Sequence, residues 1–192
     1  MEVLTMPMLS HYDADRLILR LSCGELAESV VSYLLRNRDF LEPFEPARPE
    51  VFYTVEFQRE ELEKSAEASE RGSEYRYWLC PRAKPDTVIG MVGASGIIMG
   101  AFRSCFLSYK LDKDFLRQGL AAEAVDRFVN ALFTDLRLHR VEANIMPRNI
   151  ASLSVTKKLG FANEGLSPKY LKINGIWEDH IHMVKLNTLT EV

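Results

Sequence analysis

Apolar residues recur with two different periods along this chain, and together the two periods predict a mixed α/β fold. Residues 16–21 alternate apolar and polar side chains, as a half-buried strand does. Residues 119–136 instead carry an apolar stripe at three- and four-residue steps, which is typical of an amphipathic helix: Leu120, Ala121, Ala124, Val125, Phe128, Leu132, Phe133 and Leu136. The same reasoning predicts strands at 16–21, 75–80, 87–98, 102–111, 140–145, 161–173 and 177–186, and helices at 26–36, 55–70, 119–136 and 149–159. This order indicates an α/β (α+β) fold with a mostly antiparallel central sheet of about seven strands, crossed by helices.

Proline and glycine mark the places where these elements are interrupted. Three prolines make residues 42–49 irregular, and Pro168 breaks the strand pattern of 161–173. Asn174-Gly175 stands between two strand patterns, and this dipeptide is typical of a tight hairpin turn.

Length and composition describe an ordinary soluble protein. We expect one domain, 1–192, with a loosely ordered N-terminal segment at 1–14. The net charge of −3 argues against a duplex DNA partner but not against a basic peptide. Cys23, Cys80 and Cys105 form no disulfide framework, which favours a reducing cytoplasm. The first ten residues do not have the pattern of a signal peptide, and no run approaches the roughly 20 apolar residues of a membrane span.

The segment 108–124 predicts a binding site for an anion. A strand leads through a charged link into the loop 116–121, Leu-Arg-Gln-Gly-Leu-Ala, and then into the strongest helix. The first N–H groups of a helix lack intrahelical partners, and the helix dipole favours negative charge there. Gly119 would let a phosphate approach the backbone closely. The ligand indicated by this segment carries a pyrophosphate.

Two motifs make the chain resemble the GNAT acetyltransferases, and more narrowly the ribosomal-protein-alanine acetyltransferases of the RimJ/RimL type. The loop 116–121 is similar to the family's Q/R-x-x-G-x-G/A pattern, with Leu116 in place of the usual polar residue. Residues 146–161 resemble its N-x-A-S…L-G-F segment. The resemblance implies that acetyl-coenzyme A (acetyl-CoA) is bound by Tyr109, Lys110, Leu111, Leu116, Arg117, Gln118, Gly119, Leu120, Ala121, Ala122, Asn149 and Ser152.

Within this set, the resemblance places backbone contacts to the pantetheine arm on residues 109–111. These lie on a strand that would splay from the next parallel strand. Asn149 would lie beside the same arm, although the residues alone describe it as a helix N-cap. Lys157 and Lys158 could meet the ribose phosphate or form a solvated helix face.

Two catalytic candidates follow from the resemblance. Ser152 would return a proton to the leaving thiolate, or it is a solvated serine of the first helical turn. Ser152 is the stronger candidate for this proton donor because Thr156 stands where many family members carry a tyrosine. Glu142 would serve as the base, or it is a charge at the edge of the groove or a partner for Arg140.

The implied function is direct acetyl transfer to a primary amine, most simply the N-terminal α-amino group of a protein, perhaps a ribosomal one. Two alternatives stay open, namely transfer to a small-molecule amine and a non-catalytic acyl-CoA-binding module. We expect no metal, since His180 and His182 lack further ligands at suitable spacing. We also expect no nucleic-acid or membrane partner. The protein would be a monomer or a homodimer, with Ile181, Met183 and Leu186 in either the core or a dimer contact.

Overall fold

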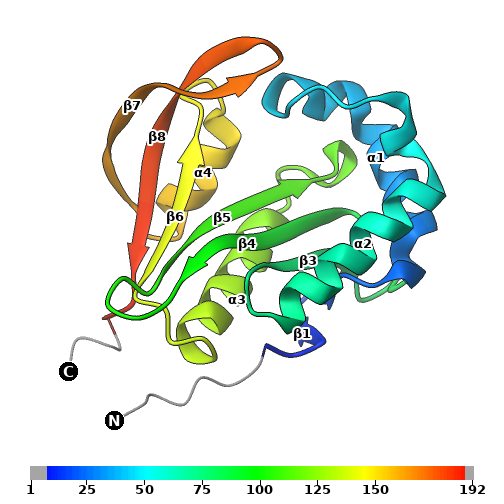
Figure 1. The fold of residues 1–192 in the computed structure, drawn as a ribbon, viewed down its shortest axis with the longest axis horizontal. Helices are drawn as coiled ribbons and strands as arrows, with labels where there is room; N and C mark the ends of the chain where they lie inside the picture. The colour runs from blue at the N-terminus through cyan, green and yellow to red at the C-terminus, as the bar shows by residue number, and fades with distance from the viewer. Residues whose placement is uncertain (1–7, 189–192) are drawn as a thin grey trace.

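Within residues 8–188, which the computed structural model describes, the central sheet has eight strands, one more than the sequence predicts. The strand order is β1-β2-β3-β4-β5-β6-β8-β7 (Figure 1). The strands are β1 His11–Asp13, β2 Leu17–Leu21, β3 Tyr75–Pro81, β4 Gly90–Ile98, β5 Ser104–Leu111, β6 Arg140–Ile145, β7 Ala162–Ile173 and β8 Ile176–Leu186. Among these strands only β5 and β6 are parallel neighbours. The predicted mixed, mostly antiparallel α/β sheet is confirmed.

The additional strand, β1, lies inside the segment 1–14. It pairs with β2 in antiparallel fashion, and its Tyr12 is only 2% exposed. The Tyr12 hydroxyl donates to the carboxylate of Asp135, 2.5 Å away. Residues 11–13 are therefore ordered, which corrects the expectation for this part; residues 1–7 lie outside the described residues. Three residues are too few to show a period in the sequence.

Helices cover both faces of the sheet. They are α1 Ala27–Leu41, α2 Val55–Glu70, α3 Leu120–Thr134 and α4 Ile150–Lys158, with short 3-10 turns η1 Gly24–Leu26, η2 Glu42–Phe44, η3 Glu50–Tyr53 and η4 Lys113–Phe115. Figure 1 shows α3 on one face of the sheet and α2 on the other. Among the described residues, no helix is long and apolar enough to cross a membrane.

Neighbouring residues of β3 show how the two faces are divided, because successive strand side chains point to opposite faces. Tyr77 packs against Phe128 of α3, with ring centroids 5.5 Å apart. Trp78 packs edge-on against Tyr33 of α1, at 6.3 Å. The apolar stripe of α3 therefore packs in a hydrophobic core on one face of the sheet. Helices α1 and α2 pack in a second core on the other face.

Strands β5 and β6 splay apart, as the resemblance implies. Their register pairs end at Phe106 and Glu142, although β5 continues to Leu111 and β6 to Ile145. In Figure 1 the two strands meet at one end and separate toward the other. Beyond Phe106 the edge of β5 that faces β6 has no strand partner among residues 8–188, so its backbone groups are available to a ligand.

The hairpin of β7 and β8 forms at the predicted Asn-Gly turn. Asn174 and Gly175 both have positive φ, at 48° and 85°, and Ile173 pairs with Ile176 across them. The register shifts between Ser167 and Leu171, where Pro168 was expected to interrupt the strand. Within β8, Met183 is fully buried in the core and Leu186 is 43% exposed, so the core alternative holds for Met183.

Candidate active site

The loop before α3 has the geometry of an anion site. Arg117 and Gly119 both have positive φ, at 60° and 78°, and α3 begins at Leu120. No side chain of the described residues caps this helix start. The first N–H groups of a helix have no intrahelical partners, and the residues that carry them here, from Gly119 to Ala122, line the cavity described below.

Arg16 holds this loop in place from the far end of the sequence. Its Nη1 donates to the carbonyl of Gln118 at 2.9 Å, and its Nε donates to Glu123 in the first turn of α3 at 2.7 Å. The backbone N–H of Arg16 also donates to Glu123. Sequence reasoning gave Arg16 only a place in a strand, because a contact across 102 to 107 positions leaves no local pattern.

Ser152 lies against the hydroxyl of Tyr109. Ser152 Oγ donates to Tyr109 Oη at 2.7 Å, and Tyr109 Oη donates to the backbone carbonyl of Ser152 at 2.9 Å. Burial raises the pKa of Tyr109 to about 12, and the hydrogen bond from Ser152 opposes that rise. The phenol is therefore neutral near pH 7. The sequence assigned Tyr109 only a backbone role, since the partners are 43 positions apart.

Asn149 caps α4. Its Oδ1 accepts from the backbone N–H of Ser152 at 3.1 Å, which fixes the first turn that carries the Ser152 hydroxyl. The N-cap interpretation is confirmed by this contact, and Asn149 also lines the cavity described next.

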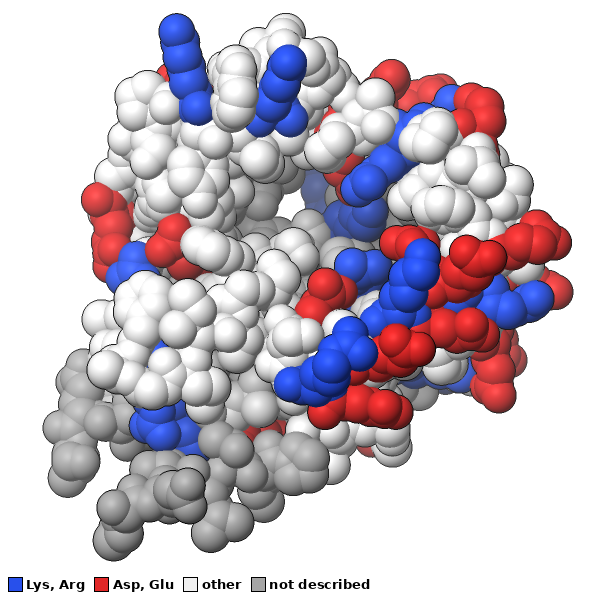
Figure 2. Space-filling view, viewed as in Figure 1, with Lys and Arg blue, Asp and Glu red and all other residues white. Residues whose placement is uncertain are grey.

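A cavity of about 1160 Å³ passes the opening between β5 and β6 and is lined from both faces of the sheet. One part, which we call the loop side, is lined by the loop 116–122 and the start of α4 at 149–155. The other part, the hairpin side, is lined by residues from 40–52 and 171–180. Figure 2 shows the molecule hollowed between the β7–β8 hairpin and the segment after α1. Of the twelve cofactor-binding candidates, all except Gln118 line this cavity.

Comparison with known proteins shows which family the chain matches. The Acetyltransferase (GNAT) domain family matches residues 16–162, more than half of the chain. The chain belongs to the GNAT acetyltransferase family. It is 42% identical over 161 residues to the probable N-acetyltransferase YjcK of Bacillus subtilis (strain 168), covering 84% of this chain and 88% of the relative.

Two further relatives carry a more specific name. The chain is 32% identical over 167 residues to the [ribosomal protein uS5]-alanine N-acetyltransferase of Escherichia coli (strain K12), covering 87% of this chain and 86% of that enzyme. The crystal structure of ribosomal-protein-S5-alanine acetyltransferase from Vibrio fischeri superimposes with a TM-score of 0.87 at 32% identity, covering 93% of this chain and 97% of that one. The protein is thus a GNAT N-acetyltransferase.

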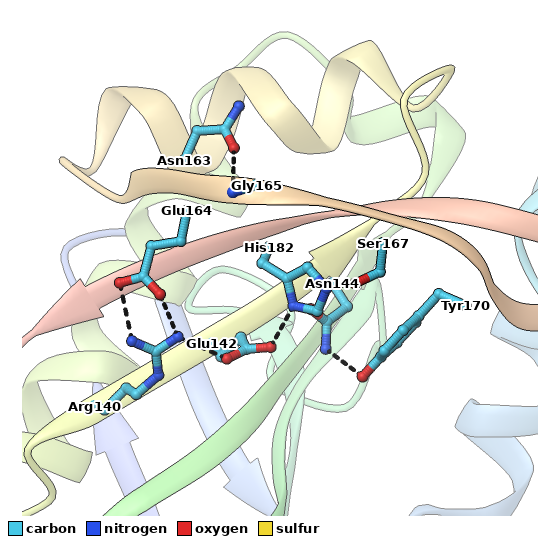
Figure 3. A network of polar contacts seen from close by, with 9 residues as sticks. All are labelled: Arg140, Glu142, Asn144, Asn163, Glu164, Gly165, Ser167, Tyr170 and His182. Atoms are coloured by element: carbon cyan, nitrogen blue, oxygen red, sulfur yellow. Dashed lines mark hydrogen bonds and ion pairs between the residues drawn. The ribbon is translucent and has the colours of Figure 1, made fainter.

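Glu142, the candidate base of this GNAT enzyme, lies in an ion-pair network outside the cavity lining (Figure 3). It pairs with Arg140 at 2.9 Å and with His182 Nδ1 at 2.7 Å, while Arg140 also pairs with Glu164 at 2.6 Å. Burial would raise the pKa of the Glu142 carboxyl, but the hydrogen bonds from His182 and Arg140 outweigh it and hold the pKa below its ordinary value. These contacts favour the alternative in which Glu142 is an ion-pair partner for Arg140 and not the base.

His182 links the same network to β7, since its Nε2 lies 2.6 Å from Ser167 Oγ. The order Ser167, His182, Glu142 has the connectivity of a nucleophile–base–acid triad. None of the three lines the cavity, so the network joins β6, β7 and β8 outside the cavity lining. The sequence named Glu142 but missed His182 as its partner, because the pairing depends on strand register.

Several other candidates are placed by the structure. Lys158 lines the cavity, whereas Lys157 does not. Burial raises the pKa of Cys80 to about 11 and that of Cys105 to about 12, so both thiols are protonated near pH 7.

No group of three or more His, Cys, Asp or Glu among residues 8–188 could hold a metal ion. His180 is 3% exposed, donates from Nδ1 to the carbonyl of Glu178, and lines the hairpin side.

The hairpin side is closed by contacts that the sequence did not predict. Asn174 at the hairpin tip donates from Nδ2 to the carbonyl of Glu42 in η2 at 2.7 Å. Lys110 pairs with Glu45 at 2.9 Å, and both side chains are partly buried. Arg148 pairs with Glu178 at 2.8 Å and lies over the Phe44 ring at 5.5 Å. Side chains from four separate segments therefore surround this part of the cavity.

Proposed function

We propose that this enzyme acetylates the N-terminal α-amino group of a protein, and that a ribosomal protein is its substrate. The observation that carries the proposal is the cavity lined from both faces at the opening of β5 and β6. Such a cavity gives donor and amine separate entrances to one point, and transfer without an enzyme intermediate requires both substrates there together. The relatives named for alanine acetylation of a ribosomal protein supply the class of acceptor.

Acetyl-CoA would lie on the loop side. Its pyrophosphate would be held by the N–H groups from Arg117 to Ala122 and its pantetheine arm by the backbone of residues 109–111, with Asn149 beside it. A backbone N–H at the start of the splayed segment would polarise the thioester carbonyl. This part of the proposal uses backbone atoms, so the replacement of the usual polar residue by Leu116 does not weaken it.

The amine would enter from the hairpin side. An α-amino group has a pKa of about 7.7–8.0, so a useful fraction is neutral near pH 7 without a strong base. Its nitrogen attacks the carbonyl carbon, a C–N bond forms and the C–S bond breaks. The amine's surplus proton passes to water, and the coenzyme A thiolate takes a proton from the Ser152 hydroxyl, which is replenished from solvent. Tyr109 holds that hydroxyl by the observed hydrogen bond.

A small-molecule amine is the second candidate. Aromatic side chains on the hairpin side favour it, because an enclosed aromatic pocket suits a small ligand: Phe40, Phe44 and Phe52. A panel assay separates the two. Free thiol release is measured with acetyl-CoA and N-terminal peptides, peptides with blocked N-termini that retain lysine, and small amines. We expect turnover of free N-terminal peptides; turnover confined to small amines would establish the second candidate, and thiol release by none of them would contradict both.

A further inference from the structure

Asn144 has an enclosed oxygen atom with no partner, at the opening of the two splayed strands. It lies on β6, two residues beyond the last β5–β6 register pair, and it lines the cavity. Its Nδ2 donates to the hydroxyl of Tyr170 at 3.2 Å (Figure 3). Its Oδ1 is buried and accepts no hydrogen bond from any described residue. Proteins seldom leave such an acceptor unpaired, so each case points to a ligand or to a specific structural cause.

A comparison within the chain supports the first explanation. Among the described residues, Tyr33 has the other buried side-chain atom of this kind, its hydroxyl oxygen. Tyr33 packs against Trp78 in the apolar cluster under α1 and does not line the cavity. Asn144 lies instead where a substrate would pass. The two orphaned atoms have different surroundings, because Asn144 is a cavity-lining residue and Tyr33 is not.

The surroundings of Asn144 fix the direction in which its oxygen points. Tyr170 accepts from the amide nitrogen, and the Tyr170 ring lies 5.4 Å from the His180 ring and 5.1 Å from the His182 ring. His182 is itself held by Glu142 and Ser167. An amide whose nitrogen is held in this way keeps its oxygen on the side away from Tyr170.

Alternation along β6 places Asn144 on the sheet face opposite α3, because Val141, Ala143 and Ile145 are buried in the α3 core. The acceptor amine would arrive on this same face. Tyr109 and Ser152 lie on the other face, where the donor would be. Asn144 Oδ1 is thus on the amine's side of the point at which the two substrates meet.

We propose that Asn144 Oδ1 accepts a hydrogen bond from the acceptor amine and orients its nitrogen toward the thioester. The inference rests on the proposed transfer to a primary amine. A neutral amide suits this role better than a carboxylate, because it takes an N–H hydrogen bond without stabilising the charged ammonium form. Tyr170 is a positioning residue that acts through Asn144.

The test compares Asn144→Leu, Asn144→Asp and Tyr170→Phe with wild type, using the amine that the wild-type enzyme turns over best. Asn144→Leu removes the acceptor, so KM for the amine should rise about tenfold while the Kd of acetyl-CoA, measured by calorimetry, stays within about twofold. Asn144→Asp keeps an oxygen in place, with Tyr170 donating to the second one, and KM for the amine should stay within about threefold. Tyr170→Phe should raise KM for the amine less than Asn144→Leu does.

Asn163→Leu is the matched control, because Asn163 Oδ1 already accepts from the Gly165 N–H and the residue lies outside the cavity lining. Its KM for the amine should not change. Unchanged kinetics in a folded Asn144→Leu variant would overturn the inference, and so would equal losses in Asn144→Leu and Asn144→Asp, which would mean that the amide nitrogen faces the amine. Wild-type turnover is measured first, so a failed proposed function shows as no turnover in wild type and is distinct from either result.

Discussion

The loop side and the hairpin side of the cavity are built in different ways. The loop side is made from contiguous backbone, a glycine turn at 116–121 and a capped helix start at 149–152. The hairpin side is made from side chains of separate segments that pair across the cavity, such as Lys110 with Glu45 and Asn174 with the carbonyl of Glu42. Backbone geometry can be the same in many relatives that share one donor. Side chains from separate segments can be exchanged one by one, which is how a shared fold acquires different acceptors.

The loop side should fail most completely when its backbone geometry is disturbed. Gly119 has φ 78°, which a β-branched residue rarely adopts, and an added Cβ would lie 3.6 Å from Arg16 Nη2. Gly119→Val should weaken acetyl-CoA binding about a hundredfold, measured by calorimetry. Gly100→Val is the control, because Gly100 has φ 73°, open space around it and no place in the cavity lining. Equal losses of binding in both variants would indicate general destabilisation and not a defect of the loop.

Chemistry on the loop side should depend on the pair of hydroxyls. Ser152→Ala should lower kcat about a hundredfold and Tyr109→Phe about tenfold, with the KM of acetyl-CoA little changed, because proton transfer contributes in the transition state. If Tyr109 acts through Ser152, the double variant should be no slower than Ser152→Ala. Tyr33→Phe removes another buried hydroxyl, one with no described partner, and should leave kcat unchanged. Additive losses would contradict a shared role.

A substitution on the hairpin side should change the KM of the acceptor amine and not the KM of acetyl-CoA. Glu45→Gln leaves Lys110 without its counter-charge, so KM for a cationic amine should rise about three- to tenfold while KM for acetyl-CoA is unchanged. Glu50→Gln is the control, since Glu50 pairs with Arg38 at the exposed surface. A rise in KM for acetyl-CoA of the same size would remove the distinction between the two sides.

The two sides also differ in how far the sequence predicts them. The loop 116–121 and the N-cap Asn149 were predicted because each depends on neighbours within a few positions. The Glu142–Arg140 pair could be predicted from the sequence because residues two apart share a strand face. The Tyr109–Ser152 contact and the orphaned oxygen of Asn144 depend on strand register and on segments that meet only in the folded chain. The eight-stranded sheet was predicted except for β1, whose three residues carry too little pattern.

Glu142 gives the smallest expected effect on activity and the clearest one on stability. Since hydrogen bonds from His182 and Arg140 lower its pKa in the folded state, it stabilises the fold above its unfolded pKa of about 4.3, and this contribution is lost as pH falls through the folded pKa. Glu142→Gln should lower the free energy of unfolding by about 1–2 kcal/mol at pH 7. By denaturant titration, the difference from wild type should shrink below about pH 4.

The same variant decides between the two roles of Glu142. As a partner of Arg140, its replacement should change kcat less than about twofold, because the network does not line the cavity. As a general base, its replacement should lower kcat about a hundredfold at least. Glu164→Gln is the matched control, because Glu164 pairs with the same Arg140 but is 41% exposed and should contribute less stability. A large loss of kcat in Glu142→Gln alone would return Glu142 to the mechanism and would mean that the amine's proton leaves through the β6–β8 network.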